Sequence, residues 1–176
     1  MNGELAPEII EDLARGDSRA GATFYDAFAR KLIQYVAGYV QDPNTVEDIV
    51  QQVFLNFFQA VKRQPQFSAP RAYLYKIARH AALEWLRTET RERNKRQRAP
   101  APVGVALEVM TSEAAPNSQR LYAALEQLPE EQRNVVMLRA FNDCTFQEIA
   151  DIAATPLQTV YKRYQAGLKH LKELLA

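Results

Sequence analysis

The sequence from Asn142 to Leu175 reads NDCTFQEIADIAATPLQTVYKRYQAGLKHLKELL and contains two helix starts ten residues apart. Thr145 and Glu148 form a capping-box pattern, in which each side chain accepts a hydrogen bond from a backbone N–H near the other residue. Thr155 before Pro156 predicts the second start, because threonine caps helices and proline is favoured at the first helical position. The stretch therefore predicts a helix-turn-helix.

The second of these two helices has an apolar face and a polar, basic face. Its apolar residues recur at helical spacing and predict a buried stripe: Leu157, Val160, Tyr164, Leu168, Leu171 and Leu175. Side chains that can reach base edges in a major groove occupy the other face: Gln158, Thr159, Tyr161, Lys162, Arg163 and Gln165. The pattern favours DNA binding, and the alternative is a helical hairpin whose basic face is merely solvated.

Length and composition leave most classes of soluble protein open. The chain has 176 residues, a formal net charge of +1 and one cysteine, Cys144, which excludes an internal disulfide. A single cysteine agrees with a reducing cytoplasm. Since no signal peptide and no long apolar run are present, we expect a cytoplasmic protein without membrane insertion. No Cys/His pattern of a zinc site is present, and we expect no metal or other cofactor.

Charge is distributed unevenly along the chain. The part up to Lys62 is acidic, whereas the segment from Arg71 to Arg98 has nine basic and three acidic residues. A local basic stripe can bind phosphates while an acidic surface elsewhere faces another partner. The charge pattern is therefore more informative than the net charge.

The clearest periodic segment begins with a further capping-box pattern at Thr45. Apolar residues keep the i, i+3, i+4 spacing from Val46 to Val61, which predicts a helix with one buried face. The opposite face is acidic and rich in amides, with one leucine among them. It is either a solvated surface or a docking face for another protein, and its residues include Glu47, Asp48, Gln51, Gln52 and Leu55.

A further helix is predicted from Pro70 to about Arg93, after a loop that contains Phe67. Basic and aromatic side chains alternate on the side away from its apolar stripe. Such a surface suits contacts with phosphates and stacking of unpaired bases, and the alternative is a solvated basic helix. The residues of this candidate surface are Tyr73, Lys76, Arg79 and His80, together with Arg71 at the start of the helix.

The segment from 96 to 118 differs from the rest, with an Ala-Pro-Ala-Pro run and no long periodicity. It predicts an extended linker between two helical units. After it, helices are expected at 119–128 and 130–141, before the helix-turn-helix. We therefore predict an all-α fold of two small domains, 1–95 and 119–176, joined by a linker at 96–118.

Three blocks of the sequence resemble bacterial sigma factors. The block Val46–Leu55 is similar to their acidic polymerase-docking helix, and Pro70–His80 to their promoter-melting helix. Leu128–Arg133, Leu138–Arg139 and Thr145–Ala150 resemble their C-terminal sigma-four domain. The three blocks occur in the family's order, and the short two-domain layout points to the extracytoplasmic-function (ECF) subfamily.

The resemblance implies an RNA polymerase sigma factor that directs promoter-specific initiation. It implies docking on the beta-prime clamp helices of core RNA polymerase by the five residues at 47–55 above, with the beta flap as a further part of the polymerase contact. Minus-ten DNA would be recognised and melted by Phe67, Arg71, Tyr73, Lys76, Arg79 and His80. Minus-thirty-five DNA would be read by Thr155, Gln158, Thr159, Tyr161, Lys162, Arg163 and Gln165. Many relatives are held by an anti-sigma factor, and the layout permits such a partner.

Other classes of protein remain as alternatives. A one-component helix-turn-helix regulator would need a ligand pocket or a dimer helix, and the acidic and basic helices in succession argue against it. An adaptor that uses these helices only for protein contacts is disfavoured by the basic recognition helix. An enzyme is least expected, because the sequence has no paired carboxylates, nucleophile constellation or glycine-rich phosphate loop.

Overall fold

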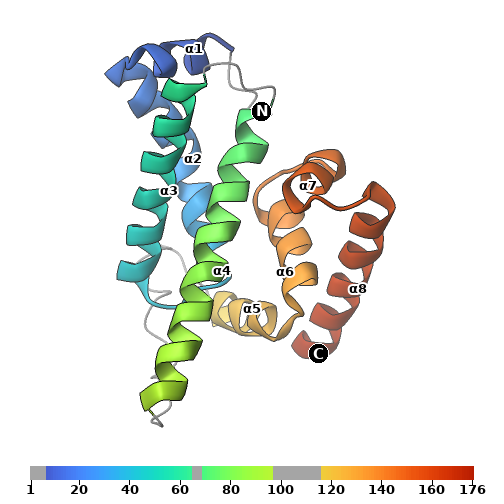
Figure 1. Cartoon of the computed structure of the whole chain (residues 1–176). Coiled ribbons are helices and arrows are strands. Elements are labelled where there is room, and N and C mark those ends of the chain that lie inside the picture. Colours follow the sequence, from blue (N-terminus) through green and yellow to red (C-terminus); the bar gives the residue numbers. More distant parts are fainter. Residues whose placement is uncertain (1–6, 65–68, 97–115) are drawn as a thin grey trace.

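The computed structural model describes residues 7–64, 69–96 and 116–176, and these residues form helices and connections without strands. The N-terminal domain consists of α1 (Pro7–Arg15), α2 (Ser18–Ala37), α3 (Pro43–Arg63) and α4 (Pro70–Arg96). The C-terminal domain consists of α5 (Pro116–Gln127), α6 (Glu130–Val136), the π-helical turn η1 (Met137–Phe141), α7 (Phe146–Ala153) and α8 (Leu157–Leu175). Figure 1 shows the two domains side by side, with α4 between α2 and α3 on one side and α6 and α7 on the other. The predicted all-α fold of two small domains is confirmed.

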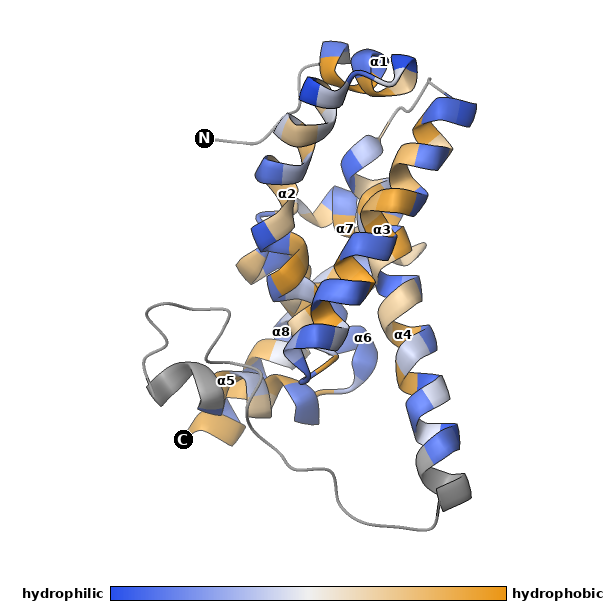
Figure 2. Ribbon diagram, turned by 90° about the vertical axis from the view of Figure 1, so that its left-hand side faces the viewer, coloured by the Kyte–Doolittle hydropathy of each residue, from blue (hydrophilic) through white to orange (hydrophobic). Residues whose placement is uncertain are grey.

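Aromatic rings fill the interior of the N-terminal domain. The ring of Phe24 on α2 stacks on that of Phe57 on α3 with centroids 4.7 Å apart, and Phe28 lies 4.8 Å from Phe24. All three rings are buried. The helical stripe predicted on α3 therefore meets the apolar face of α2, and in Figure 2 hydrophobic and hydrophilic residues alternate along these amphipathic helices.

The start of α3 corrects one prediction. Asp42, rather than Thr45, occupies the N-cap position, and its carboxylate accepts hydrogen bonds from the Thr45 backbone N–H and hydroxyl. Pro43 then stands at the start of the helix, where its missing N–H costs nothing. The sequence Asp42-Pro43 supplies a complete helix start three residues before the predicted capping box, which explains the shift.

The helix-turn-helix is formed by α7 and α8. The capping box at Thr145 and Glu148 is confirmed, since each side chain accepts a hydrogen bond from the other residue's backbone N–H. The connection turns at Ala154, which adopts the left-handed conformation with φ 47°. The second predicted cap is wrong, because the Thr155 hydroxyl donates to the carbonyl of Ala153 and α8 begins at Leu157 without a side-chain cap.

Gly167 lies in the middle of α8, where glycine is unfavourable for a helix by about 1 kcal/mol relative to alanine. A Cβ at this position would lie 2.7 Å from Cγ2 of Val136 on α6. The glycine therefore permits the close approach of α6 and α8. Leu168, its neighbour, was predicted to be buried but is 42% exposed, since α6 covers the adjacent face of the helix.

The two domains pack directly on each other. Helix α4 contacts α7, and α2 contacts η1, so that the buried apolar residues of both domains form one continuous cluster. We call this contact the interdomain interface. Its polar and close-packed residues come from the N-terminal domain (Lys31, Tyr35, Tyr39, Gly38, Arg71, Tyr75 and Arg79) and from the C-terminal domain (Glu130, Arg133, Asn134, Met137, Asn142, Asp143 and Glu148).

Candidate functional site

The candidate docking face lies along the outer side of α3. The apolar face of α3 packs into the domain, so the opposite face of the helix points to solvent. Gln52 donates a hydrogen bond to Asn56 at 2.8 Å, and Leu55 is 55% exposed, which is unusual for leucine. The five predicted residues are all exposed, and they are Glu47, Asp48, Gln51, Gln52 and Leu55.

The candidate minus-ten residues on α4 do not share one environment. Lys76 and His80 are exposed, and His80 lies 3.7 Å from Glu84 through its Nδ1 atom. Tyr73 is partly buried, with its ring centroid 6.2 Å from that of Phe57. Phe67 lies outside the described residues. Within the described part of this candidate set, a clearly solvent-facing position is therefore limited to Lys76 and His80.

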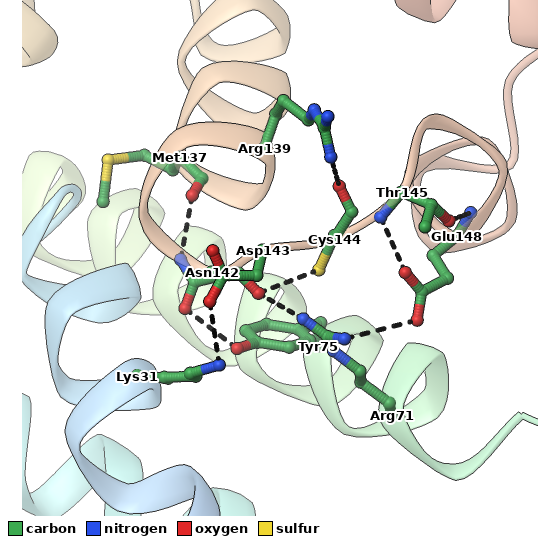
Figure 3. A network of polar contacts seen from close by, with 10 residues as sticks. All are labelled: Lys31, Arg71, Tyr75, Met137, Arg139, Asn142, Asp143, Cys144, Thr145 and Glu148. Carbon is green, nitrogen blue, oxygen red and sulfur yellow. Dashed lines mark hydrogen bonds and ion pairs between the residues drawn. The ribbon is translucent and has the colours of Figure 1, made fainter. Parts of the chain in front are cut away.

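Arg71 and Arg79 point toward the C-terminal domain. Arg71 donates to the backbone carbonyl of Asn142 and forms an ion pair with Glu148 at 3.6 Å (Figure 3). Arg79 forms a two-pronged pair with Glu130, with Nε and Nη2 at 3.1 and 3.0 Å from its two carboxylate oxygens. Bidentate arginine–carboxylate pairs are among the stronger and more directional ion pairs. Both arginines thus connect the two domains.

Two tyrosines of the N-terminal domain donate hydrogen bonds to two asparagines of the C-terminal domain. The hydroxyl of Tyr35 lies 2.7 Å from Oδ1 of Asn134, and that of Tyr75 lies 2.8 Å from Oδ1 of Asn142. All four residues are buried, and burial raises the pKa of both tyrosines above the ordinary value. Both phenols therefore remain protonated and act as donors at any physiological pH.

The loop between η1 and α7 is fixed by the same network. Asn142 also donates to the carbonyl of Met137, and Asp143 adopts a positive φ of 54° and pairs with Lys31 at 3.1 Å. That hydrogen bond to Lys31 lowers the pKa of the Asp143 carboxyl. The next residue, Cys144, is fully buried, and burial raises the pKa of its thiol to about 11. Figure 3 shows these side chains converging on Arg71 and Tyr75.

The candidate recognition helix, α8, presents part of its predicted set to solvent. Gln158, Tyr161, Lys162 and Gln165 are exposed, and Thr159 is partly buried. The ring of Tyr161 packs on Phe146 of α7 with centroids 4.3 Å apart. The guanidinium of Arg139 lies over the same Phe146 ring at 4.9 Å, so the tyrosine is held at one end of an ordered stack.

Thr155 and Arg163 have partners within the C-terminal domain. Arg163 pairs with Glu131 at 2.5 Å and donates to the hydroxyl of Thr155 at 3.1 Å. These contacts connect the start of α8 to the start of α6. The two residues are thus placed to fix the recognition helix, a role that sequence reasoning did not assign to them.

Sequence reasoning missed the interdomain residues as a group. Arg71, Tyr75 and Arg79 recur every four residues on α4, which places them on one helix face. This spacing was the available signal, but a polar stripe gives no indication of whether water or another domain covers it. Of their partners, Glu148 is predicted only as part of a capping box, and no interdomain role is predicted for Glu130.

Comparison with known proteins assigns both domains. Residues 24–92 match the model for sigma-70 region 2, and residues 118–171 match that for sigma-70 region 4. The chain is 27% identical to the ECF RNA polymerase sigma factor SigX of Bacillus subtilis, over 85% of this chain and 80% of that protein. It is 26% identical to the ECF RNA polymerase sigma factor SigK of Mycobacterium ulcerans, over 95% of this chain and 91% of that protein.

Two solved structures share the arrangement of helices. The structure of CnrH in complex with the cytosolic domain of CnrY matches with a TM-score of 0.74 and 19% identity, over 96% of both chains. The sigma factor RpoE of Bartonella quintana, in a complex with the anti-sigma factor NepR, matches with a TM-score of 0.71 and 19% identity. That match covers 87% of this chain and 96% of the other.

A helix-turn-helix domain of region 4 type behind a region 2 domain defines a transcription initiation factor of the sigma-70 class. Such proteins bind RNA polymerase and promoter DNA and are not enzymes. The chain belongs to the ECF group of RNA polymerase sigma factors. The alternative of a one-component regulator is not favoured. Among the described residues, no helix is long and apolar enough to cross a membrane.

Proposed function

We propose that the chain docks on the beta-prime clamp helices of core RNA polymerase through the outer face of α3. The exposure of Glu47, Asp48, Gln51, Gln52 and Leu55 on one face of α3 supports this proposal, and it is the observation that carries it. Two acids supply charge complementarity to a basic partner, and Leu55 supplies apolar area at the centre of the face. The beta flap is the proposed second contact, with the C-terminal domain. The complex would act in the cytoplasm.

The N-terminal domain is proposed to recognise and open the minus-ten element. Lys76 and His80 are exposed on α4 and can contact the strand directly. Phe67, Arg71, Tyr73 and Arg79 complete the proposed set, and the two arginines become available only when their partners in the C-terminal domain are released. Strand separation would draw its free energy from contacts with the unpaired strand.

Helix α8 is proposed to read the minus-thirty-five element in the major groove. Gln158, Tyr161, Lys162 and Gln165 are exposed and supply hydrogen-bond donors, acceptors and one positive charge, with Thr159 beside them. Thr155 and Arg163 belong to the proposed set as residues near the start of the helix. Arg163 donates a hydrogen bond to Thr155 and forms an ion pair with Glu131, and these contacts support an orienting role for both residues.

The proposed units are a sigma-two domain at 1–95, a linker at 96–118 and a sigma-four domain at 119–176. Residues 97–115 of that linker lie outside the described residues. An anti-sigma factor is proposed as a further partner. Both solved structures above are complexes, one with the cytosolic domain of CnrY and one with an anti-sigma factor, and this supports the proposal.

The deciding experiment compares Asp48→Arg with Gln59→Arg in a pull-down of core RNA polymerase. Both positions are exposed on α3, but Gln59 lies outside the proposed docking set. We expect Asp48→Arg to abolish retention of core polymerase and Gln59→Arg to preserve it. Equal retention of polymerase by both variants, with unchanged circular dichroism, would exclude this docking face.

In vitro transcription on genomic fragments then maps the promoters. New transcripts with discrete start sites, dependent on both the chain and core polymerase, are the expected result. Protection of duplex DNA by the chain alone, without polymerase-dependent transcripts, would favour a regulator that acts without polymerase.

A further inference from the structure

Two apolar side chains at the start of α8 are exposed to solvent. Leu157 is 37% exposed and Tyr161 is 45% exposed, although leucine is among the residues most often found buried. The sequence pattern predicts Leu157 in the buried stripe of this helix, and the structure shows that this prediction is wrong. The two residues are four positions apart, so their side chains are neighbours on one face of the helix. We call these two side chains the apolar strip.

The apolar strip lies beside the polar face of α8. Helices α6 and α7 pack on α8, and Val160 and Leu171 are the large apolar residues that α8 buries. Side chains that can form hydrogen bonds or carry charge lie next to the strip on the exposed side, and they are Gln158, Lys162 and Gln165. The apolar strip therefore belongs to the surface that the proposed function assigns to the minus-thirty-five element.

The ring of Tyr161 is held in place by residues from outside α8. It packs at 4.3 Å on the ring of Phe146, which is the first residue of α7. The guanidinium of Arg139 lies 4.9 Å from the same Phe146 ring, and its Nη1 atom donates to the carbonyl of Cys144 at 3.1 Å. Tyr164 meets Phe146 edge-on at 5.3 Å. A side chain that is already ordered loses little conformational entropy when it binds a partner.

The position of the strip on α8 and its chemistry indicate one feature of duplex DNA. Leu157 is the first residue of α8 and Tyr161 follows about one turn later, and the N-terminal residues of a recognition helix are those that contact base edges. Base edges in the major groove present hydrogen-bond donors and acceptors and a single kind of apolar group, the C5-methyl group of thymine. A leucine packed against donors or acceptors would leave them unpaired. The thymine methyl group is therefore the feature that fits the strip.

We propose that Leu157 and Tyr161 select thymine in the minus-thirty-five element by packing on its C5-methyl group, and that Phe146 and Arg139 are positioning residues for Tyr161. The inference rests on the proposed role of α8 at that element, and it adds Leu157 to the residues that read the sequence. Burial of one methyl group favours thymine roughly fourfold over the same base without the methyl group. Thymine is favoured over cytosine for the same reason, because cytosine has no methyl group at C5.

The test removes the methyl group and leaves the base pair unchanged. The full chain is combined with core RNA polymerase, and its affinity for a duplex promoter fragment is measured by competition, with a promoter mapped by transcription with this chain. Each thymine of the minus-thirty-five element is replaced in turn by deoxyuridine, which pairs as thymine does and lacks the methyl group. The ratio of the two affinities is the methyl effect. For the wild type we expect roughly fourfold weaker binding at one thymine or more.

Variants of α8 then assign the methyl effect to the strip. Leu157→Ala with Tyr161→Ala removes both side chains, and the methyl effect should disappear. Leu157→Ala alone leaves the stack on Phe146 intact and should reduce the effect, so the test does not depend on the folding of the double variant. Tyr161→Phe keeps the ring and should keep the effect. Leu168→Ala is the matched control, because this leucine is 42% exposed on α8 but lies further from the start of the helix.

Phe146→Ala tests the positioning role. This variant retains Leu157 and Tyr161 but removes the ring on which the tyrosine packs, and we expect a smaller methyl effect. The methyl effect compares two duplexes bound by the same protein, so a general loss of affinity or stability cancels from it. The dependence of affinity on salt concentration should be the same for all of these variants and the wild type, because no charged residue is changed.

Other outcomes would overturn the proposal. The absence of a methyl effect in the wild type, or an equal effect in the wild type and the double variant, would exclude thymine selection by the strip. Loss of core polymerase retention by the double variant in a pull-down would assign the strip to a protein contact instead. A full methyl effect in Phe146→Ala would exclude the positioning role.

A duplex with a scrambled minus-thirty-five element tests the proposed function separately. If the wild type with core polymerase binds this duplex as tightly as the native promoter, the proposed role of α8 fails and the inference fails with it. If scrambling weakens binding but deoxyuridine does not, the proposed role of α8 stands and thymine selection through the methyl group is excluded.

Discussion

The interior of the N-terminal domain and the interdomain interface are both buried, but they differ in chemistry. In the interior, rings such as Phe24, Phe28 and Phe57 pack on one another without polar atoms. In the interface, tyrosine hydroxyls meet asparagine amides and arginines meet glutamates. Separation of the first exposes only apolar area, whereas separation of the second exposes polar groups that water can satisfy besides part of the apolar cluster that the two domains share. The comparison indicates that the aromatic interior is the permanent contact and that the interdomain interface can open.

The largest effect is expected from Phe57→Ala in the domain interior. Removal of a fully buried ring that stacks on Phe24 should lower the free energy of unfolding by about 3–5 kcal/mol. Urea denaturation measures the change. Gln59→Ala, an exposed position on the same helix, should stay within about 0.5 kcal/mol of the wild type. A similar small effect for Phe57→Ala would mean that the interior is not the permanent contact.

Tyr75→Phe tests the interdomain interface at a single hydroxyl. The change leaves Oδ1 of Asn142 buried without its donor, which should destabilise the closed arrangement by about 1–3 kcal/mol. Hydrogen exchange of the backbone amides in α4 and in the loop before α7 should become faster. Exchange of the amides in α2 and α3, which pack on each other in the domain interior, should stay slow. Tyr25→Phe, at a ring 43% exposed on α2, is the matched control. Faster exchange throughout the N-terminal domain would contradict the distinction between a permanent domain interior and an interface that can open.

Two glycines allow the same change inside one domain, here the C-terminal domain, and at the interdomain interface. A Cβ at Gly167 would lie 2.7 Å from the stiff side chain of Val136, and at Gly38 it would lie 2.8 Å from the flexible end of Met137. Overpacking at Gly167 should cost about 1–3 kcal/mol, offset in part by about 1 kcal/mol of helix propensity. Gly38→Ala should cost less, because the methionine or the whole domain can move. Thermal unfolding of the two variants ranks their losses of stability. A larger loss of stability for Gly38→Ala than for Gly167→Ala would contradict this expectation.

The smallest effect is expected from pH at the edge of the interface. The hydrogen bond and charge of Lys31 lower the pKa of Asp143 below its ordinary value of 3.8. A carboxyl with a lowered pKa stabilises the structure above its ordinary pKa, and this stabilisation is lost as the pH falls through the lowered value. The difference in stability between wild type and Asp143→Asn should therefore be present at neutral pH and shrink below pH 3.8. Unfolding titrations at several pH values measure it, and a constant difference would remove this ion pair from the interface.

Much of the fold could be predicted from local patterns. The i, i+3, i+4 spacing on α3 fixed both its buried face and the exposed face with Leu55, because a helix that buries one stripe must expose the opposite one. Thr145 and Glu148 marked the start of α7 correctly, since both hydrogen bonds of a capping box are local. These features depend only on neighbouring residues.

Sequence patterns do not show where a distant segment decides the environment of a side chain. Arg71 and Arg79 have the same polar, basic character as Lys76, but Glu148 and Glu130 cover them from across the chain. Gly167 had no explanation in the sequence, because its partner Val136 lies on another helix. A side chain's polarity predicts that it needs a polar partner, and only the tertiary structure shows whether that partner is water or a second domain.

Cys144 provides a chemical probe of how often the loop before α7 opens. It is the single cysteine of the chain, it is fully buried next to Asn142, and its raised pKa keeps the thiol protonated and unreactive. Alkylating reagents attack the thiolate of an accessible cysteine. The rate of alkylation at this one sulfur therefore reports how often the loop before α7 loses its cover, and each labelled molecule counts one opening of the unmodified wild-type chain.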